Sequence, residues 1–193
     1  MNLPNILTVG RILVTPLFII LLFYDHPYAK SWALLIFIAA MLTDIFDGYY
    51  ARKYNLVTDY GRFLDPLADK VMVLSALISF AVMDVIPYWM VSLIIFRDLF
   101  VTGLRMAMSS KNKTMVTSNI AKRKTLSQVF VIIFILFNIG FNSLSISWVG
   151  ELILFSKKYE LIYYCTLLVT VFTVFTGLTY LYTNRSVIKQ FIS

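Results

Sequence analysis

Six long apolar runs constrain this chain more than any other feature of its sequence. About 20 apolar residues in helical conformation cross the hydrocarbon core of a bilayer, where only helices and closed barrels satisfy their backbone polar groups. We therefore predict an all-α, integral membrane bundle of six transmembrane helices that forms a single domain over residues 1–193. The runs are Ile6–Phe23, Ser31–Tyr50, Phe63–Met83, Ile86–Met108, Thr125–Phe141, which could extend toward Trp148, and Leu161–Tyr182.

The composition agrees with a membrane protein. Hydrophobic residues make up 60% of the chain and charged residues 14%, whereas soluble domains average about 45–50% and about 25%. The formal net charge is +7, which in a soluble protein would suggest nucleic acid. Here the basic residues lie in short segments between apolar runs, so we expect them to set topology and attract anionic lipid head groups, with no nucleic-acid partner.

The distribution of Lys and Arg predicts the orientation. Ten of them fall in the segments on one side of the predicted bundle and three on the other, namely Lys30 and the loop residues Lys157 and Lys158. The positive-inside rule places the richer side in the cytoplasm. Both termini then face the cytoplasm, and we expect a multi-pass protein of the cell membrane.

Four aspartates lie at the cytoplasmic ends of the second and third predicted spans. Asp44 and Asp47 are three residues apart, and Asp65 and Asp69 are four apart. Each pair should therefore lie on one face of its helix. Because a short loop joins the two helices as an antiparallel hairpin, the four carboxylates can converge just below the cytoplasmic face.

Such a cluster needs a positive charge. A carboxylate at the centre of a span costs about 2.5–3.5 kcal/mol on insertion scales, and neighbouring carboxylates repel one another. Arg52 and Lys70 could offset part of this cost, but clustered oxygen ligands suit Mg²⁺ or Mn²⁺. Gly48 and Gly61 beside the aspartates indicate that something large approaches the backbone, although close helix packing is the simpler reading of either glycine alone. Four surface carboxylates without a metal would leave these glycines unexplained.

The complete pattern resembles a known family signature. Asp44-x-x-Asp47-Gly48-x-x-Ala51-Arg52 is followed, after eight residues, by Gly61-x-x-x-Asp65-x-x-x-Asp69. All eight positions match the signature of the CDP-alcohol phosphatidyltransferases at its spacing, and the six-span topology is similar to that of the family. The resemblance implies transfer of a phosphatidyl group from CDP-diacylglycerol to an alcohol.

The resemblance also implies roles for individual residues. Asp44, Asp47 and Asp65 would hold a first metal ion. Asp69 would complete a two-metal site of Mg²⁺ or Mn²⁺ and act as the catalytic base on the acceptor hydroxyl. The expected CDP-lipid-binding residues are Thr43, Gly48, Ala51, Arg52 and Gly61. The family further suggests a homodimer through the later spans, among membrane lipids.

Flanking segments point to the acceptor alcohol. Three of them resemble the bacterial family members that use glycerol 3-phosphate: Asn2–Thr8, Phe96–Arg105 and Ala121–Gln128, the last with alanine where those members usually have glycine at position 121. Glycerol 3-phosphate is a small dianion, and Arg105, Lys122 and Lys124 are placed to bind its phosphate. Topology and lipid attraction alone would also account for Lys122 and Lys124.

Other readings stay open at this point. An inositol phosphate would be equally anionic, and serine or phosphatidylglycerol would be acceptors for the same chemistry. An ion-coupled transporter also uses intramembrane acids, but it would more commonly show mid-membrane acids and internal repeats. A di-metal carboxylate oxidase would require Glu-x-x-His motifs, and the chain contains one histidine.

Overall fold

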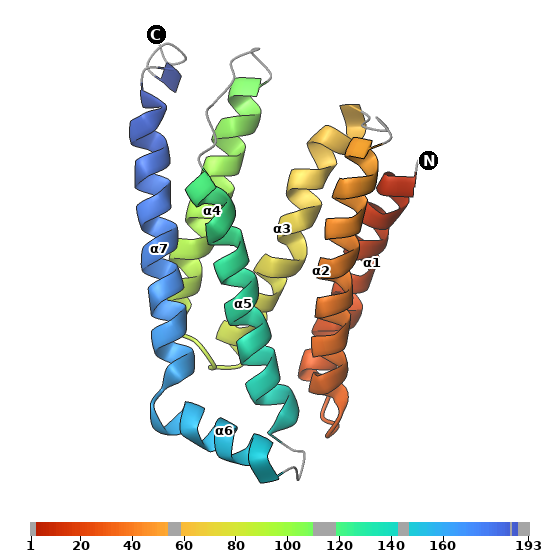
Figure 1. The fold of residues 1–193 in the computed structure, drawn as a ribbon, viewed down its shortest axis with the longest axis vertical. Coiled ribbons are helices and arrows are strands. Elements are labelled where there is room, and N and C mark those ends of the chain that lie inside the picture. The colour runs from red at the N-terminus through yellow and green to blue at the C-terminus, as the bar shows by residue number, and fades with distance from the viewer. Residues whose placement is uncertain (1–2, 54–58, 110–118, 143–146, 186, 189–193) are drawn as a thin grey trace.

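The computed structural model describes residues 3–53, 59–109, 119–142, 147–185 and 187–188. Within these ranges the chain is helical and contains no strand. The helices are α1 (Leu3–Phe23), α2 (Ala29–Lys53), α3 (Asp59–Val82), α4 (Tyr88–Ser109), α5 (Asn119–Phe141), α6 (Ser147–Lys158) and α7 (Leu161–Thr183). Figure 1 shows the long helices running up and down, with the N- and C-terminal ends at the same end of the bundle.

The prediction of an all-helical fold is confirmed, and six of the helices correspond to the six predicted apolar runs. The fifth run ends at Phe141 as predicted and does not extend toward Trp148, because a separate helix, α6, contains that residue. The 12 residues of α6 are too few to cross a bilayer. Lys157 and Lys158, expected in a loop, form the last turn of α6.

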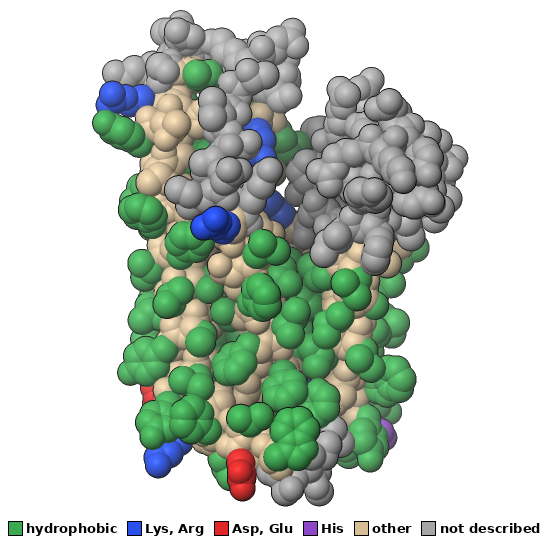
Figure 2. Space-filling model, in the orientation of Figure 1, with side chains coloured by type: hydrophobic (Ala, Val, Ile, Leu, Met, Phe, Trp, Pro, Cys, Tyr) green, Lys and Arg blue, Asp and Glu red, His purple; other side chains and the backbone are tan. Residues whose placement is uncertain are grey.

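Two helices in the described ranges are long and apolar enough to cross a membrane. They are Arg123–Phe141, with a mean hydropathy of 1.8, and Leu161–Thr183, with a mean hydropathy of 1.9. The stretches Gly10–Phe23, Ala29–Thr43 and Lys70–Val82 are shorter apolar helices. Figure 2 shows apolar side chains covering the visible face of the bundle between its two ends.

The core lies mainly between α1, α2, α3 and α5, and Val91 and Ile94 of α4 and Val169 of α7 join it. Phe18 of α1, Phe37 of α2 and Phe80 of α3 are fully buried there, and the Phe18 and Phe37 ring centroids are 5.8 Å apart. α7 packs on the other side, against α4 and α5. The central helices therefore have neighbours on several sides, and α7 presents its outer face to the surroundings.

Close backbone contact fixes α5 against α2. The Ser31 hydroxyl donates a hydrogen bond to the Gly140 carbonyl oxygen at 2.8 Å. A Cβ atom at Gly140 would lie 3.2 Å from the Lys30 carbonyl oxygen, so a larger residue would push the helices apart. Small residues commonly allow this approach between membrane helices.

Candidate active site

The four signature aspartates lie on two consecutive helices at similar distances from the helix ends. α2 ends at Lys53 and α3 begins at Asp59, so Asp47 and Asp65 each stand six residues from these ends. At 1.5 Å per residue this is about 9 Å along each helix. Asp44 and Asp69 stand nine and ten residues away, or about 13–15 Å. Each pair therefore lies in the half of its helix that adjoins the other helix in sequence.

The side chains of residues 44–53 and 59–69 lie outside the part that the structure describes, so metal binding by these aspartates stays a prediction. Their chemistry fits the implied metal, because carboxylate oxygens are the ligands that Mg²⁺ and Mn²⁺ prefer. Among the described side chains, no other group of three or more His, Cys, Asp or Glu residues could hold a metal ion.

The predicted CDP-lipid-binding residues occupy the same two helices. Thr43, Gly48, Ala51 and Arg52 lie in the last three turns of α2, and Gly61 lies in the first turn of α3. The Thr43 side chain is exposed, and its hydroxyl donates to the Ala40 carbonyl oxygen at 2.8 Å. The other four fall among the residues whose side chains are not described.

A buried polar cluster centres on Asp98 of α4, and we call it the Asp98 cluster. Asp98 is 3% exposed. Its Oδ1 atom accepts hydrogen bonds from Lys124 Nζ of α5 and, at 3.3 Å, from Arg97 Nη1. Its Oδ2 atom accepts from Gln128 Nε2 at 3.4 Å. A carboxylate buried to this degree needs such partners, because an unpaired charge is costly in a medium of low dielectric constant.

Lys70 connects this cluster to the acidic motif. It directly follows Asp69 in α3, and its ammonium group donates to the Asp98 carbonyl oxygen at 2.8 Å and to the Thr102 hydroxyl. The helix that carries Asp65 and Asp69 is thereby tied to α4.

Arg97 ties α4 to α7 on the other side. Its Nη2 atom donates to the Thr176 hydroxyl at 3.2 Å. A Cβ atom at Gly177 would lie 2.8 Å from Arg97 Cγ, so the absence of a side chain at this position makes room for the arginine. The Asp98 cluster therefore joins α3, α4, α5 and α7.

The three predicted acceptor-phosphate residues have different surroundings. Lys124 is 2% exposed and paired with Asp98. Arg105 is exposed, and its guanidinium carbon lies 5.8 Å from the centroid of the Tyr180 ring. The Lys122 side chain lies outside the described residues. Phosphate binding by all three stays a prediction.

Sequence reasoning did not identify Asp98 as the centre of a network. Arg97 was expected either to contribute to binding of the anionic acceptor or to pair with Asp98, and the contacts of Lys70, Gln128 and Thr176 with these two residues were not foreseen. One signal was available, because an ionisable residue in the middle of an apolar run indicates a functional site with a partner on another helix. Choosing that partner required knowledge of the tertiary structure, in which Lys124 and Gln128 of α5 reach Asp98 of α4.

Comparison with known proteins agrees with the signature. The family model for CDP-alcohol phosphatidyltransferase matches residues 1–172. A CDP-diacylglycerol–glycerol-3-phosphate 3-phosphatidyltransferase of Bacillus subtilis strain 168 is 40% identical over 157 residues, covering 75% of this chain and 81% of the relative. A Rickettsia bellii protein of the same name is 41% identical, covering 79% and 85%. A probable phosphatidylglycerophosphate synthase of Mycobacterium tuberculosis strain H37Rv is 45% identical over 109 residues, covering 55% and 52%.

The apolar helices and these matches together define a helical membrane protein that is a transferase of phospholipid synthesis. The chain belongs to the CDP-alcohol phosphatidyltransferase family.

Proposed function

We propose that this chain transfers the phosphatidyl group of CDP-diacylglycerol to sn-glycerol 3-phosphate, giving phosphatidylglycerophosphate and CMP. The proposal rests on one observation: the aspartate signature and the Asp98 cluster adjoin each other on α3. The aspartate signature reaches Asp69, and the next residue, Lys70, enters the Asp98 cluster. The site for an activated phosphate donor would thus adjoin a cationic region suited to a phosphorylated acceptor. Relatives at about 40% identity carry the name of this reaction.

The donor would bind over the ends of α2 and α3. Gly48, Ala51 and Gly61 would leave room for the nucleotide and its phosphates, and Arg52 would pair with the diphosphate. Mg²⁺ or Mn²⁺, held by Asp44, Asp47, Asp65 and Asp69, would neutralise phosphate oxygens and stabilise the departing CMP.

The acceptor hydroxyl would attack the phosphorus that carries the lipid. Asp69 takes the hydroxyl proton as the new P–O bond forms and the P–O bond to CMP breaks. A carboxylate near cations is a weak base, so orientation of the hydroxyl must supply much of the rate. Arg105, Lys122 and Lys124 would hold the phosphate of the acceptor and thereby fix that orientation.

The proposed topology has six spans formed by α1–α5 and α7, with both termini in the cytoplasm and the site near the cytoplasmic face of the cell membrane. The predominance of basic residues on that side supports it, as does the placement of both chain ends at the same end of the bundle (Figure 1). α6 would then lie at the opposite membrane surface. We also propose that the protein forms a homodimer.

The test is transfer of label from glycerol 3-phosphate into lipid by purified protein. We expect chloroform-soluble label only when CDP-diacylglycerol and Mg²⁺ or Mn²⁺ are both present. Labelled lipid formed without CDP-diacylglycerol, or no labelled lipid from protein that elutes as a single folded species, would refute the proposed reaction.

A further inference from the structure

The inward faces of the helices carry polar side chains at one level of the bundle. On α4 the buried positions Met90, Ile94 and Val101 follow helical spacing, and Asp98 occupies the same stripe. On α5, Lys124 and Gln128 precede the buried Ile132 and Leu136 on one face. The apolar stripes of these helices are thus interrupted where Lys124 and Gln128 bond to Asp98. Buried charges cost free energy unless they are paired.

Two cationic side chains contact the carboxylate of Asp98. They are the ammonium group of Lys124 and the guanidinium of Arg97, whereas the ammonium group of Lys70 contacts the Asp98 backbone carbonyl oxygen. Among the described side chains, two formal positive charges therefore meet this one carboxylate. An anionic ligand with several acceptor oxygens, such as a phosphate monoester, would complement them.

The carboxylate orients these cations from a fixed position. Asp98 holds Lys124 and Arg97 through one oxygen and Gln128 through the other, and its backbone carbonyl oxygen receives Lys70. A lysine ammonium has three donors, so Lys124 can bond to Asp98 and still donate to a second anion. Arg97 is further fixed by Thr176 of α7. Side chains held in this way lose less freedom when a ligand binds.

We propose that Asp98 is a positioning residue of the acceptor site, which holds Lys124 and the neighbouring cations ready for the phosphate of the acceptor alcohol. This inference rests on the proposed function. Asp98 itself does not contact the acceptor, and it acts through Lys124. It therefore affects recognition of a phosphorylated acceptor more than recognition of CDP-diacylglycerol.

Replacing the Asp98 carboxylate by an amide distinguishes a role in positioning Lys124 from an effect of the net charge of the cluster. Asp98→Asn leaves the side-chain shape nearly unchanged and makes the cluster more positive. If charge alone mattered, the variant would bind the phosphate more tightly, and the KM for glycerol 3-phosphate would fall. If Asp98 positions Lys124, that KM rises, by about tenfold for the loss of a charge-assisted hydrogen bond, while the KM for CDP-diacylglycerol stays unchanged.

The experiment measures both KM values and kcat for the purified wild type, Asp98→Asn, Asp98→Glu, Lys124→Gln and the double variant Asp98→Asn/Lys124→Gln. Ser31→Ala is the matched control, since it removes an interhelical hydrogen bond at the opposite end of the bundle. We expect partial rescue in Asp98→Glu. We also expect the double variant to match Lys124→Gln, because Asp98 acts on the acceptor phosphate through Lys124.

The double variant also covers a failure of Asp98→Asn to fold, since it removes the buried Lys124 charge that Asp98→Asn would leave without its carboxylate. An acceptor KM that falls or stays constant in Asp98→Asn, or a double variant that adds the two single effects, overturns the inference. So does an equal rise in the KM for CDP-diacylglycerol, which would indicate a purely structural role. If the wild type uses only an uncharged acceptor, both the proposed acceptor and the role of Asp98 are refuted. If the wild type uses glycerol 3-phosphate and the acceptor KM of Asp98→Asn is unchanged, only the role of Asp98 is refuted.

Discussion

At the scale of single residues, Asp98 and the four signature aspartates place unusual charge inside an apolar chain. Asp98 is compensated by side chains that the structure describes, through Lys124, Arg97 and Gln128. The signature aspartates would be compensated by divalent metal. The roles of these acids therefore differ. Asp98 orients cationic side chains, whereas the signature aspartates would bind metal ions at the substrate site.

Asp69 has the sharpest expected effect on catalysis. In Asp69→Asn the side chain keeps its size and loses the ability to take the acceptor proton. We expect kcat to fall by about 10²–10⁴, the usual contribution of a general base, while binding of CDP-diacylglycerol is largely kept. Single-turnover CMP release and a separate donor-binding titration measure the two effects. Near-normal turnover would show that Asp69 is not the base.

Lys122 offers a test of acceptor binding with a neighbouring control. Lys122→Ala should raise the KM for glycerol 3-phosphate more than the KM for CDP-diacylglycerol, by several-fold for one phosphate contact. Arg123→Ala removes the same charge from an exposed position one residue away and should change neither KM. Equal effects of the two substitutions would indicate that this basic run serves only topology and lipid attraction.

At the level of the helices, Arg97 of α4 packs against α7 at Gly177, which has no side chain. Gly177→Ala adds an atom that would lie 2.8 Å from Arg97 Cγ. Overpacking of this kind costs about 1–3 kcal/mol, more than the roughly 1 kcal/mol gained from the better helix propensity of alanine. We expect a lower thermal midpoint in detergent.

Gly150→Ala in α6 is the control for this substitution, because a Cβ atom there meets nothing within 4 Å. Its midpoint should stay constant or rise through helix propensity alone. If the Gly177 variant were as stable as the Gly150 variant, the packing of Arg97 against α7 would not contribute to stability.

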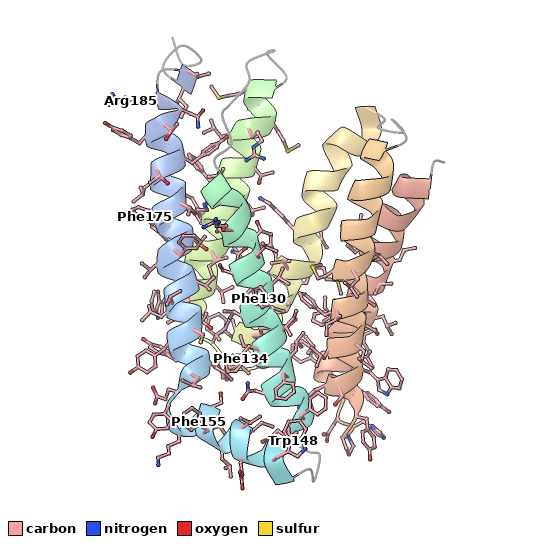
Figure 3. The ribbon with its side chains drawn as sticks, viewed as in Figure 1. Phe130, Phe134, Trp148, Phe155, Phe175 and Arg185 are labelled. Carbon is pink, nitrogen blue, oxygen red and sulfur yellow. The ribbon has the colours of Figure 1, made fainter. Side chains whose placement is uncertain are left out.

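α6 provides a test of the proposed topology. Val149, Ile153 and Ser156 are buried, whereas Trp148, Leu152 and Phe155 are more than half exposed. Figure 3 shows Trp148 and Phe155 on α6, at the opposite end of the bundle from Arg185. A short helix with an apolar outer face and a terminal Lys157–Lys158 pair is suited to the membrane interface, where Trp and Tyr concentrate.

We therefore expect Trp148 to lie at a shallow depth in the bilayer. In a protein with Trp32→Phe and Trp89→Phe, lipids brominated near the head group should quench the remaining fluorescence more strongly than lipids brominated near the end of the acyl chain. Efficient quenching by aqueous iodide, with none by brominated lipid, would place α6 away from the membrane.

The sequence predicted the long helices better than their contacts. Apolar length and the positions of Pro and charged residues define α1–α4 and α7 to within four residues, whereas α5 begins at Asn119, six residues before the predicted Thr125. α6 was not predicted, because its 12 residues mix Glu151, Lys157 and Lys158 with apolar ones and resemble a loop between spans. The Asp98 cluster was not predicted, because its partners come from α3, α5 and α7, and local sequence patterns do not specify which helices pack together.

At the scale of the whole molecule, the fold groups its polar chemistry toward one end. The signature aspartates lie in the adjoining halves of α2 and α3. Lys70, in the middle of α3, contacts α4, which Lys124 and Arg97 connect to α5 and α7. The opposite end contains the chain reversals at Asp84 and Glu160, both with positive φ, and α6. This asymmetry suits an enzyme that meets a lipid donor within the bilayer and a soluble, anionic acceptor at one membrane surface.

The most direct measurement of the central claim is CMP release by the detergent-purified chain, supplied with CDP-diacylglycerol and a panel of acceptors in the presence of Mg²⁺ or Mn²⁺. The panel contains glycerol 3-phosphate, inositol phosphate, serine and phosphatidylglycerol. We expect rapid release with glycerol 3-phosphate alone, abolished by a chelator and restored by added metal. Release with a different acceptor, or release that persists in the chelator, would contradict the proposed reaction.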